Sequence, residues 1–82
     1  MLGNPVRTVN LQGMIMPNDF NRNGEPIEIM LETRNFIQYR IAQNRKGREL
    51  MEHTFREVQL EGVVDNEVDP PILTIDNYQF LS

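Results

Sequence analysis

The sequence predicts an all-β domain with little helix, built as a closed barrel of five strands. Apolar and polar residues alternate with a period of two along most of the chain, which is typical of strands that bury one face. One stretch near the middle changes to a helical period. The 82 residues suffice for a single domain, and a sheet of five short strands removes its exposed edges by closing on itself.

Three strands are expected in the first half of the chain. Residues 7–16 form the first, where Gly13 marks a bulge or a sharp bend. Residues 17–25 form a loop by composition, because they are rich in asparagine and contain an Asn-Gly turn dipeptide. Residues 26–33 form the second strand and residues 36–42 the third.

The helix is expected over residues 48–55, where apolar side chains recur four positions apart. Asn44 or Gly47 is a suitable cap for its start. A helix of this length depends on packing for its stability. We therefore expect three apolar side chains to close one end of the barrel: Leu50, Met51 and Phe55.

Two further strands are expected after the helix. Residues 57–64 alternate again, with Gly62 on the apolar face. Residues 72–81 alternate with a change of phase between Ile75 and Tyr78. That change predicts a bulge near Asp76 and Asn77.

Three local patterns accompany this order of elements: Tyr39 in the third strand, the G-x-E-L run of Gly47 to Leu50, and the V-x-L-x-G-x-V run of Val58 to Val64. With them the chain resembles the OB-fold superfamily, and within it the small bacterial single OB domains, over residues 7–81. The resemblance implies a strongly coiled first strand and a helix between strands three and four. It also implies a ligand face on strands two and three and the loops beside them.

On this chain the implied ligand face combines aromatic, amide and basic side chains: Phe20, Arg22, Phe36, Gln38 and Arg40. Aromatic rings that stack on bases and cations that contact phosphates are what single-stranded nucleic acid requires. Glu28 and Glu32 are expected on the same face, and the loop at residues 65–69 is acidic, so phosphates would be repelled. Nucleic-acid or oligosaccharide binding there is the alternative function.

A second candidate surface is an apolar row outside the barrel. If the first strand lies between the second and the fourth, Met14, Met30 and Val63 can line up, and Met16 extends the row. Contiguous exposed apolar patches mark contact sites, and methionine suits adaptable interfaces. This row predicts self-association or docking of a protein partner.

Metal binding and catalysis are not expected. Residues 19–24 match the opening of a calcium loop, but Met30 replaces the glutamate expected at position twelve, so an ordinary turn is the better interpretation. There is no cysteine, His53 is the only histidine, and Ser82 is the only serine. No nucleophile and base are placed together, so we predict no catalytic residues, no metal and no cofactor.

The charge distribution and the targeting signals limit the expected ligands and compartment. The net charge is −4, every basic residue lies at or before Arg56, and six acidic residues follow it, which disfavours broad affinity for nucleic acid. No signal peptide or membrane span is evident, so we expect a soluble cytoplasmic protein.

Residues 1–6 are expected to be a flexible start and residues 7–82 one domain. The predicted function is a non-catalytic binding or assembly module, which contacts a protein partner or itself.

Overall fold

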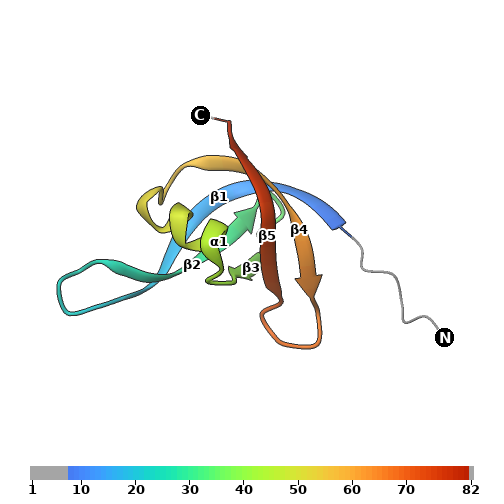
Figure 1. The fold of residues 1–82 in the computed structure, drawn as a ribbon. Helices are drawn as coiled ribbons and strands as arrows, with labels where there is room; N and C mark the ends of the chain where they lie inside the picture. The colour runs from blue at the N-terminus through green and yellow to red at the C-terminus, as the bar shows by residue number, and fades with distance from the viewer. Residues whose placement is uncertain (1–7, 82) are drawn as a thin grey trace.

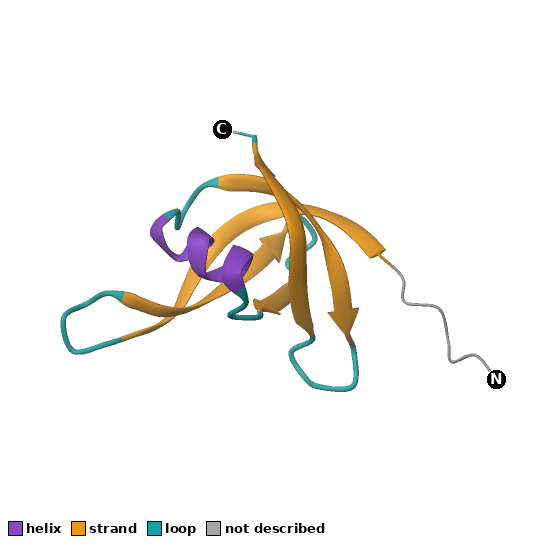
Figure 2. Cartoon of the chain, viewed as in Figure 1, coloured by secondary structure: helices purple, strands orange, loops and turns teal. Residues whose placement is uncertain are grey.

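The computed structural model describes residues 8–81, which form a five-stranded closed barrel with one short helical segment (Figures 1 and 2). The predicted fold class and order of elements are confirmed. The predicted flexible segment 1–6 lies outside the described residues. The elements are β1 (Thr8–Phe20), β2 (Pro26–Thr33), β3 (Gln38–Ile41), α1 (Arg45–Glu49), the 3-10 turn η1 (Leu50–Glu52), β4 (Glu57–Asp65) and β5 (Ile72–Phe80).

The barrel closes in the order β1-β2-β3-β5-β4, with β4 returning to β1. Neighbouring strands are antiparallel except β3 and β5, which pair in parallel where Arg40 lies opposite Ile72. Strand β1 closes the barrel by pairing with two different strands along its length. Its residues 8–14 pair with β4, and its residues 13–20 pair with β2. A strand shared in this way must coil strongly, as the resemblance implied.

Gly13 lies where β1 passes from one partner strand to the other. It is opposite both Thr33 in β2 and Val58 in β4, and a Cβ atom here would collide with the backbone oxygen of Glu32. The glycine therefore permits a close approach of two backbones. The bulge predicted in β5 is also confirmed, because the register skips Asp76 between its two neighbours.

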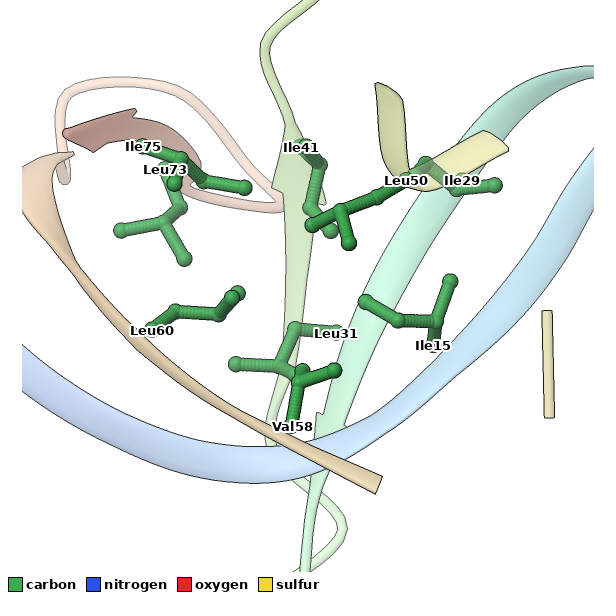
Figure 3. Close-up of a cluster of buried hydrophobic side chains, with 9 residues drawn as sticks. All are labelled: Ile15, Ile29, Leu31, Ile41, Leu50, Val58, Leu60, Leu73 and Ile75. Carbon is green, nitrogen blue, oxygen red and sulfur yellow. The ribbon is translucent and has the colours of Figure 1, made fainter. Parts of the chain in front are cut away.

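The barrel is filled by nine apolar side chains that are almost completely inaccessible to solvent (Figure 3). Eight come from the strands, and Leu50 enters from η1 to cover one end. The nine are Ile15, Ile29, Leu31, Ile41, Leu50, Val58, Leu60, Leu73 and Ile75.

The helical segment begins and ends three residues earlier than predicted. The side chain of Asn44 accepts a hydrogen bond from the Gly47 N–H at 2.9 Å and so sets the start of α1. Its amide also donates to the backbone oxygen of Ile75 at 3.0 Å, which ties the helix to β5. Leu50 and Met51 pack on the core as predicted. Phe55 does not, because it lies beyond the helix.

The backbone at Phe55 explains its exposure. Its N–H donates to the Ile15 oxygen at 2.6 Å, and the Ile15 N–H donates to the Arg56 oxygen at 3.0 Å, so residues 55 and 56 extend the pairing of β4 with β1. Phe55 has a φ of 66° and is 62% exposed. The prediction that it closes the barrel end is therefore wrong.

The strand limits differ from prediction on both sides of β2. Strand β1 continues to Phe20, four residues past its predicted end, because the first part of the predicted loop pairs with β2. Strand β3 begins at Gln38 and not at Phe36. Phe36 has a φ of 63° and donates its N–H to the Thr33 oxygen at 3.0 Å, which places it in the β2–β3 turn.

A hydrogen bond between Tyr78 and Glu49 joins the helical segment to β5. The Tyr78 hydroxyl donates to Glu49 Oε1 at 2.8 Å. This bond, with smaller contributions from burial and from the carboxylate charge, raises the pKa of Tyr78 above its ordinary value of 10.0. The folded chain thus retains a proton that the unfolded chain releases near pH 10.

The stabilising effect of this pair is therefore expected to be present below about pH 10 and lost as the pH rises through the folded-state pKa of Tyr78. An absorbance titration of the phenol checks it. We expect Glu49→Ala to bring the Tyr78 transition back toward the ordinary value. An unchanged transition in that variant would show that Glu49 does not control the pKa.

Candidate functional site

The most prominent surface feature is the end of the β1–β2 hairpin, which projects away from the barrel (Figure 1). We call residues 17–29 the arm. Its tip is closed by Asn21, whose side-chain oxygen accepts hydrogen bonds from the backbone N–H groups of Asn23 at 2.9 Å and Glu25 at 3.0 Å. Gly24 supplies a φ of 78°. The residues that matched a calcium loop thus build a turn, and no acidic or histidine cluster suited to a metal occurs among residues 8–81.

Two irregularities in the pairing of β1 with β2 change the direction in which side chains of the arm point. The register runs from Pro17 opposite Ile29 to Phe20 opposite Pro26, and it skips Asn18 on one strand and Ile27 on the other. Bulges of this kind break the strict in–out alternation of side chains. Phe20 is 51% exposed and Ile27 is 42% exposed. Strict alternation along residues 26–33 would place Ile27 on the same face as Ile29 and Leu31, and the skipped position explains why it is exposed instead.

The strand edges of the arm are partly blocked. Pro17 has no N–H to offer at the edge of β1, and the Gln43 side chain donates to the backbone oxygen of Ile27 at 2.7 Å. Proline, bulges and side-chain caps are the usual devices that prevent another strand from adding to a sheet. A molecule that contacts the arm must therefore use its side chains more than its backbone.

Polar groups of the predicted ligand face on β2 and β3 are paired with one another. Arg40 Nε lies 3.0 Å from Glu28 Oε1, and the second oxygen of Glu28 accepts from Asn18 at 2.6 Å. Gln38 donates to Glu32 at 3.1 Å. A phosphate at this face would have to compete with Glu28 for Arg40.

The two aromatic residues assigned to that face are far apart. Phe20 lies opposite Pro26 at the start of β2, whereas Phe36 follows Thr33 at its end. Seven residues of strand separate the two ends, a span of about 23 Å. Arg22 is exposed at the arm tip, so the five residues fall into three places: Gln38 and Arg40 on β3, Phe20 and Arg22 near the arm tip, and Phe36 in the β2–β3 turn.

The predicted apolar row is broken by the strand register. Met16, and not Met14, lies opposite Met30. Met14, however, lies opposite Glu32 and Glu57, and Val63 lies opposite Thr8, six residues away along β1. Met30 is only 5% exposed. The prediction of a continuous row is wrong, because a strand register depends on pairing that a single sequence does not reveal.

A hollow of about 290 Å³ lies beside the β2–β3 turn. Its wall is mixed: Leu11, Ile37 and Tyr39 supply apolar surface, and the other lining residues are polar, namely Asn10, Gln12, Thr33, Arg34 and Asn35. Ile37 lies within the predicted third strand, where alternation would bury it with Tyr39 and Ile41, but it is 48% exposed because it precedes β3. The neighbouring Phe36 is 82% exposed with a positive φ, a conformation that costs energy in a bulky residue.

A second hollow, of about 350 Å³, is polar. It lies on β1, β4 and β5 and is lined mainly by amide side chains with one carboxylate: Asn10, Gln59, Asn77, Gln79 and Glu61. These residues form cross-strand rows, with Asn10 opposite Glu61 and Glu61 opposite Asn77. Such a surface favours water over an apolar side chain.

His53 lies against an aromatic ring and not beside a nucleophile. Its ring centroid is 4.8 Å from that of Phe80, and the Arg56 guanidinium stacks on the same Phe80 ring at 4.0 Å. Arg56 also lies 3.5 Å from His53 Nδ1. These contacts pack His53 and Arg56 against Phe80 near the start of β4.

Comparison with known proteins gave no relative: no family model, no curated protein and no solved structure matches the chain. Within residues 8–81, no helix is long and apolar enough to cross a membrane.

Proposed function

We propose that this chain is a non-catalytic protein-interaction module whose contact surface is the arm. The observation that carries the proposal is the exposure of Phe20 and Ile27 on a hairpin that projects from the barrel. Burying a large apolar side chain contributes about 1.5–3 kcal/mol, so two of them offer a partner a substantial gain. The blocked strand edges favour recognition through these side chains.

We also assign the barrel to the OB-fold superfamily. Support for this assignment comes from the strand order β1-β2-β3-β5-β4, from the parallel pairing of β3 with β5, and from the helix between β3 and β4. The position of the helix agrees with what the resemblance implied. The assignment concerns the fold, and function depends on the residues that this chain places on it.

Binding of single-stranded nucleic acid or of an oligosaccharide at the β2–β3 face is the alternative, with weaker support. The pairing of Arg40 with Glu28 lowers its availability to phosphates. The separation of Phe20 from Phe36 removes a continuous stacking platform. Glu28 and Glu32 remain on the face that a polyanion would have to approach.

Site-specific photo-cross-linking tests the proposed contact surface. A photoreactive phenylalanine analogue at position 20 or 27 is expected to give protein cross-links in cells that express the full chain. The same analogue at Gln59 or Gln79, exposed positions of β4 and β5, is the matched control and is expected to give none. Excess unmodified chain should compete for the same contact.

A lack of protein cross-links from both arm positions would contradict the proposal. Equal cross-linking from the arm and from the control positions would contradict it as well, because it would show random collision.

A further inference from the structure

We propose that the partner of the arm is a second copy of this chain. In this arrangement Phe20 of one copy enters the hollow beside the β2–β3 turn of the next copy, and Asp19 of the first faces Arg34 of the second. The inference rests on the proposed function of the arm as a protein contact, and it adds the identity and the geometry of that contact.

The hollow has room for an aromatic side chain and offers it apolar contact on part of its wall. A dry cavity of about 150 Å³ holds a benzene ring, and the hollow measures about 290 Å³. Leu11, Ile37 and Tyr39 provide apolar contact, and Phe20 is an exposed ring on a projecting arm. The larger hollow on β1, β4 and β5 is a poorer receptor, because its wall holds the Glu61 carboxylate in addition to amides, and entry of an aromatic ring would desolvate that charge.

The charges of the two surfaces are complementary. Among the described residues that line the hollow, Arg34 alone is charged. Phe20 follows Asp19 directly, and Asp19 Oδ1 accepts the Phe20 N–H at 2.9 Å, so a carboxylate is held close to the base of the ring. Docking of the ring brings this carboxylate to the side of the guanidinium. Complementary charge of this kind fixes the orientation of a contact.

The geometry requires two copies and gives a head-to-tail arrangement. The arm and the turn lie at opposite ends of β2, about 23 Å apart along the strand, so a copy cannot fill its own hollow. Two different surfaces that bind each other form a heterologous interface, which produces chains or closed rings. A two-fold arrangement with Phe36 as the inserted ring is less favourable, because it would bring the Arg34 side chains of two copies together.

Sedimentation equilibrium on the purified full chain tests this inference. The average mass of the wild type is expected to rise with concentration. Phe20→Ser removes the inserted ring and Ile37→Asp makes the hollow polar, so each is expected to hold the mass at that of a monomer. Phe55→Ser alters an equally exposed phenylalanine outside both surfaces and is expected to associate like the wild type.

Mixing the two defective variants distinguishes the head-to-tail arrangement from a two-fold one. The Phe20→Ser copy keeps an intact hollow and the Ile37→Asp copy keeps an intact arm, so an equimolar mixture is expected to form a dimer that grows no further. A two-fold contact built from one surface would not be rescued in this way. Circular dichroism checks that each variant is folded, and Arg34→Glu is the second hollow variant should Ile37→Asp fail to fold.

The charge contact has its own test. Arg34→Glu is expected to weaken association about tenfold, and the double variant Asp19→Arg with Arg34→Asp is expected to restore it, because the pair is exchanged between the two surfaces. The inference is overturned if the wild type stays a monomer at millimolar concentration or if Phe20→Ser still associates. Cross-links from position 20 to a different protein alone would overturn it and leave the proposed function standing.

Discussion

Replacing Leu50 with alanine is expected to lower the free energy of unfolding by about 3 kcal/mol. Leu50 is completely buried and enters the core from η1, outside the strands. Its truncation leaves a cavity at the end of the barrel and also releases the helical segment. That segment is too short to persist without packing, so the two effects reinforce each other.

Urea denaturation followed by circular dichroism measures this loss. Leu81→Ala is the matched control, since it removes the same atoms from a side chain that is 42% exposed, and it is expected to change stability by less than about 0.5 kcal/mol. If Leu50→Ala were as stable as Leu81→Ala, Leu50 would not close the barrel.

Replacing Gly13 with alanine is expected to destabilise the chain by about 2–3 kcal/mol. The added Cβ atom would meet the backbone oxygen of Glu32, and a backbone group cannot turn aside as a flexible side chain can. Because β1 pairs with β2 and β4 at this point, the strain affects both the β1–β2 pairing and the β1–β4 pairing.

Gly24→Ala separates this steric effect from the conformational freedom of glycine. Gly24 has a φ of 78° and no atom near the position of an added Cβ, so its replacement is expected to cost only the left-handed penalty of about 1 kcal/mol. Thermal unfolding of the two variants compares the costs. A Gly13→Ala variant that melts at the wild-type temperature would show that β1 and β2 do not approach closely there.

Local patterns in the sequence were sufficient to predict the elements. Alternation located β2 and β4 almost to the residue, and the change of phase after Ile75 located the bulge at Asp76. Gly13 was recognised as a point of strong bending before its contacts were known. These features depend on the residues within one strand, which is why a single sequence reveals them.

Features that depend on pairing between strands were not predictable in the same way. Val63 was placed beside Met14, but the register sets Glu57 there. Phe36 was placed in a strand although its positive φ belongs to a turn. The pair Arg34-Asn35 before it was the available signal, since asparagine favours turns, and it would also have moved Ile37 from the core to the surface.

The candidate site was predictable only in part. Phe20 was selected as a contact residue, but on a nucleic-acid face that the Arg40–Glu28 ion pair does not favour. The exposure of Ile27 is not predictable from alternation, which places it on the same face as Ile29 and Leu31, and no pattern within β2 indicates the two skipped positions of the arm. The hollow at Leu11, Ile37 and Tyr39 combines two distant segments of the chain, residues 10–12 and residues 33–39, so it is visible only in the fold.

The most direct test of the arm as a contact surface is a dilution series of the isotopically labelled wild-type chain followed by backbone NMR. We expect the concentration-dependent shifts to occur in two groups at the same time, one within residues 17–29 of the arm and one at residues 33–39 beside the hollow. Shifts confined to the outer face of β1, β4 and β5, with the arm unchanged at every concentration, would contradict the account.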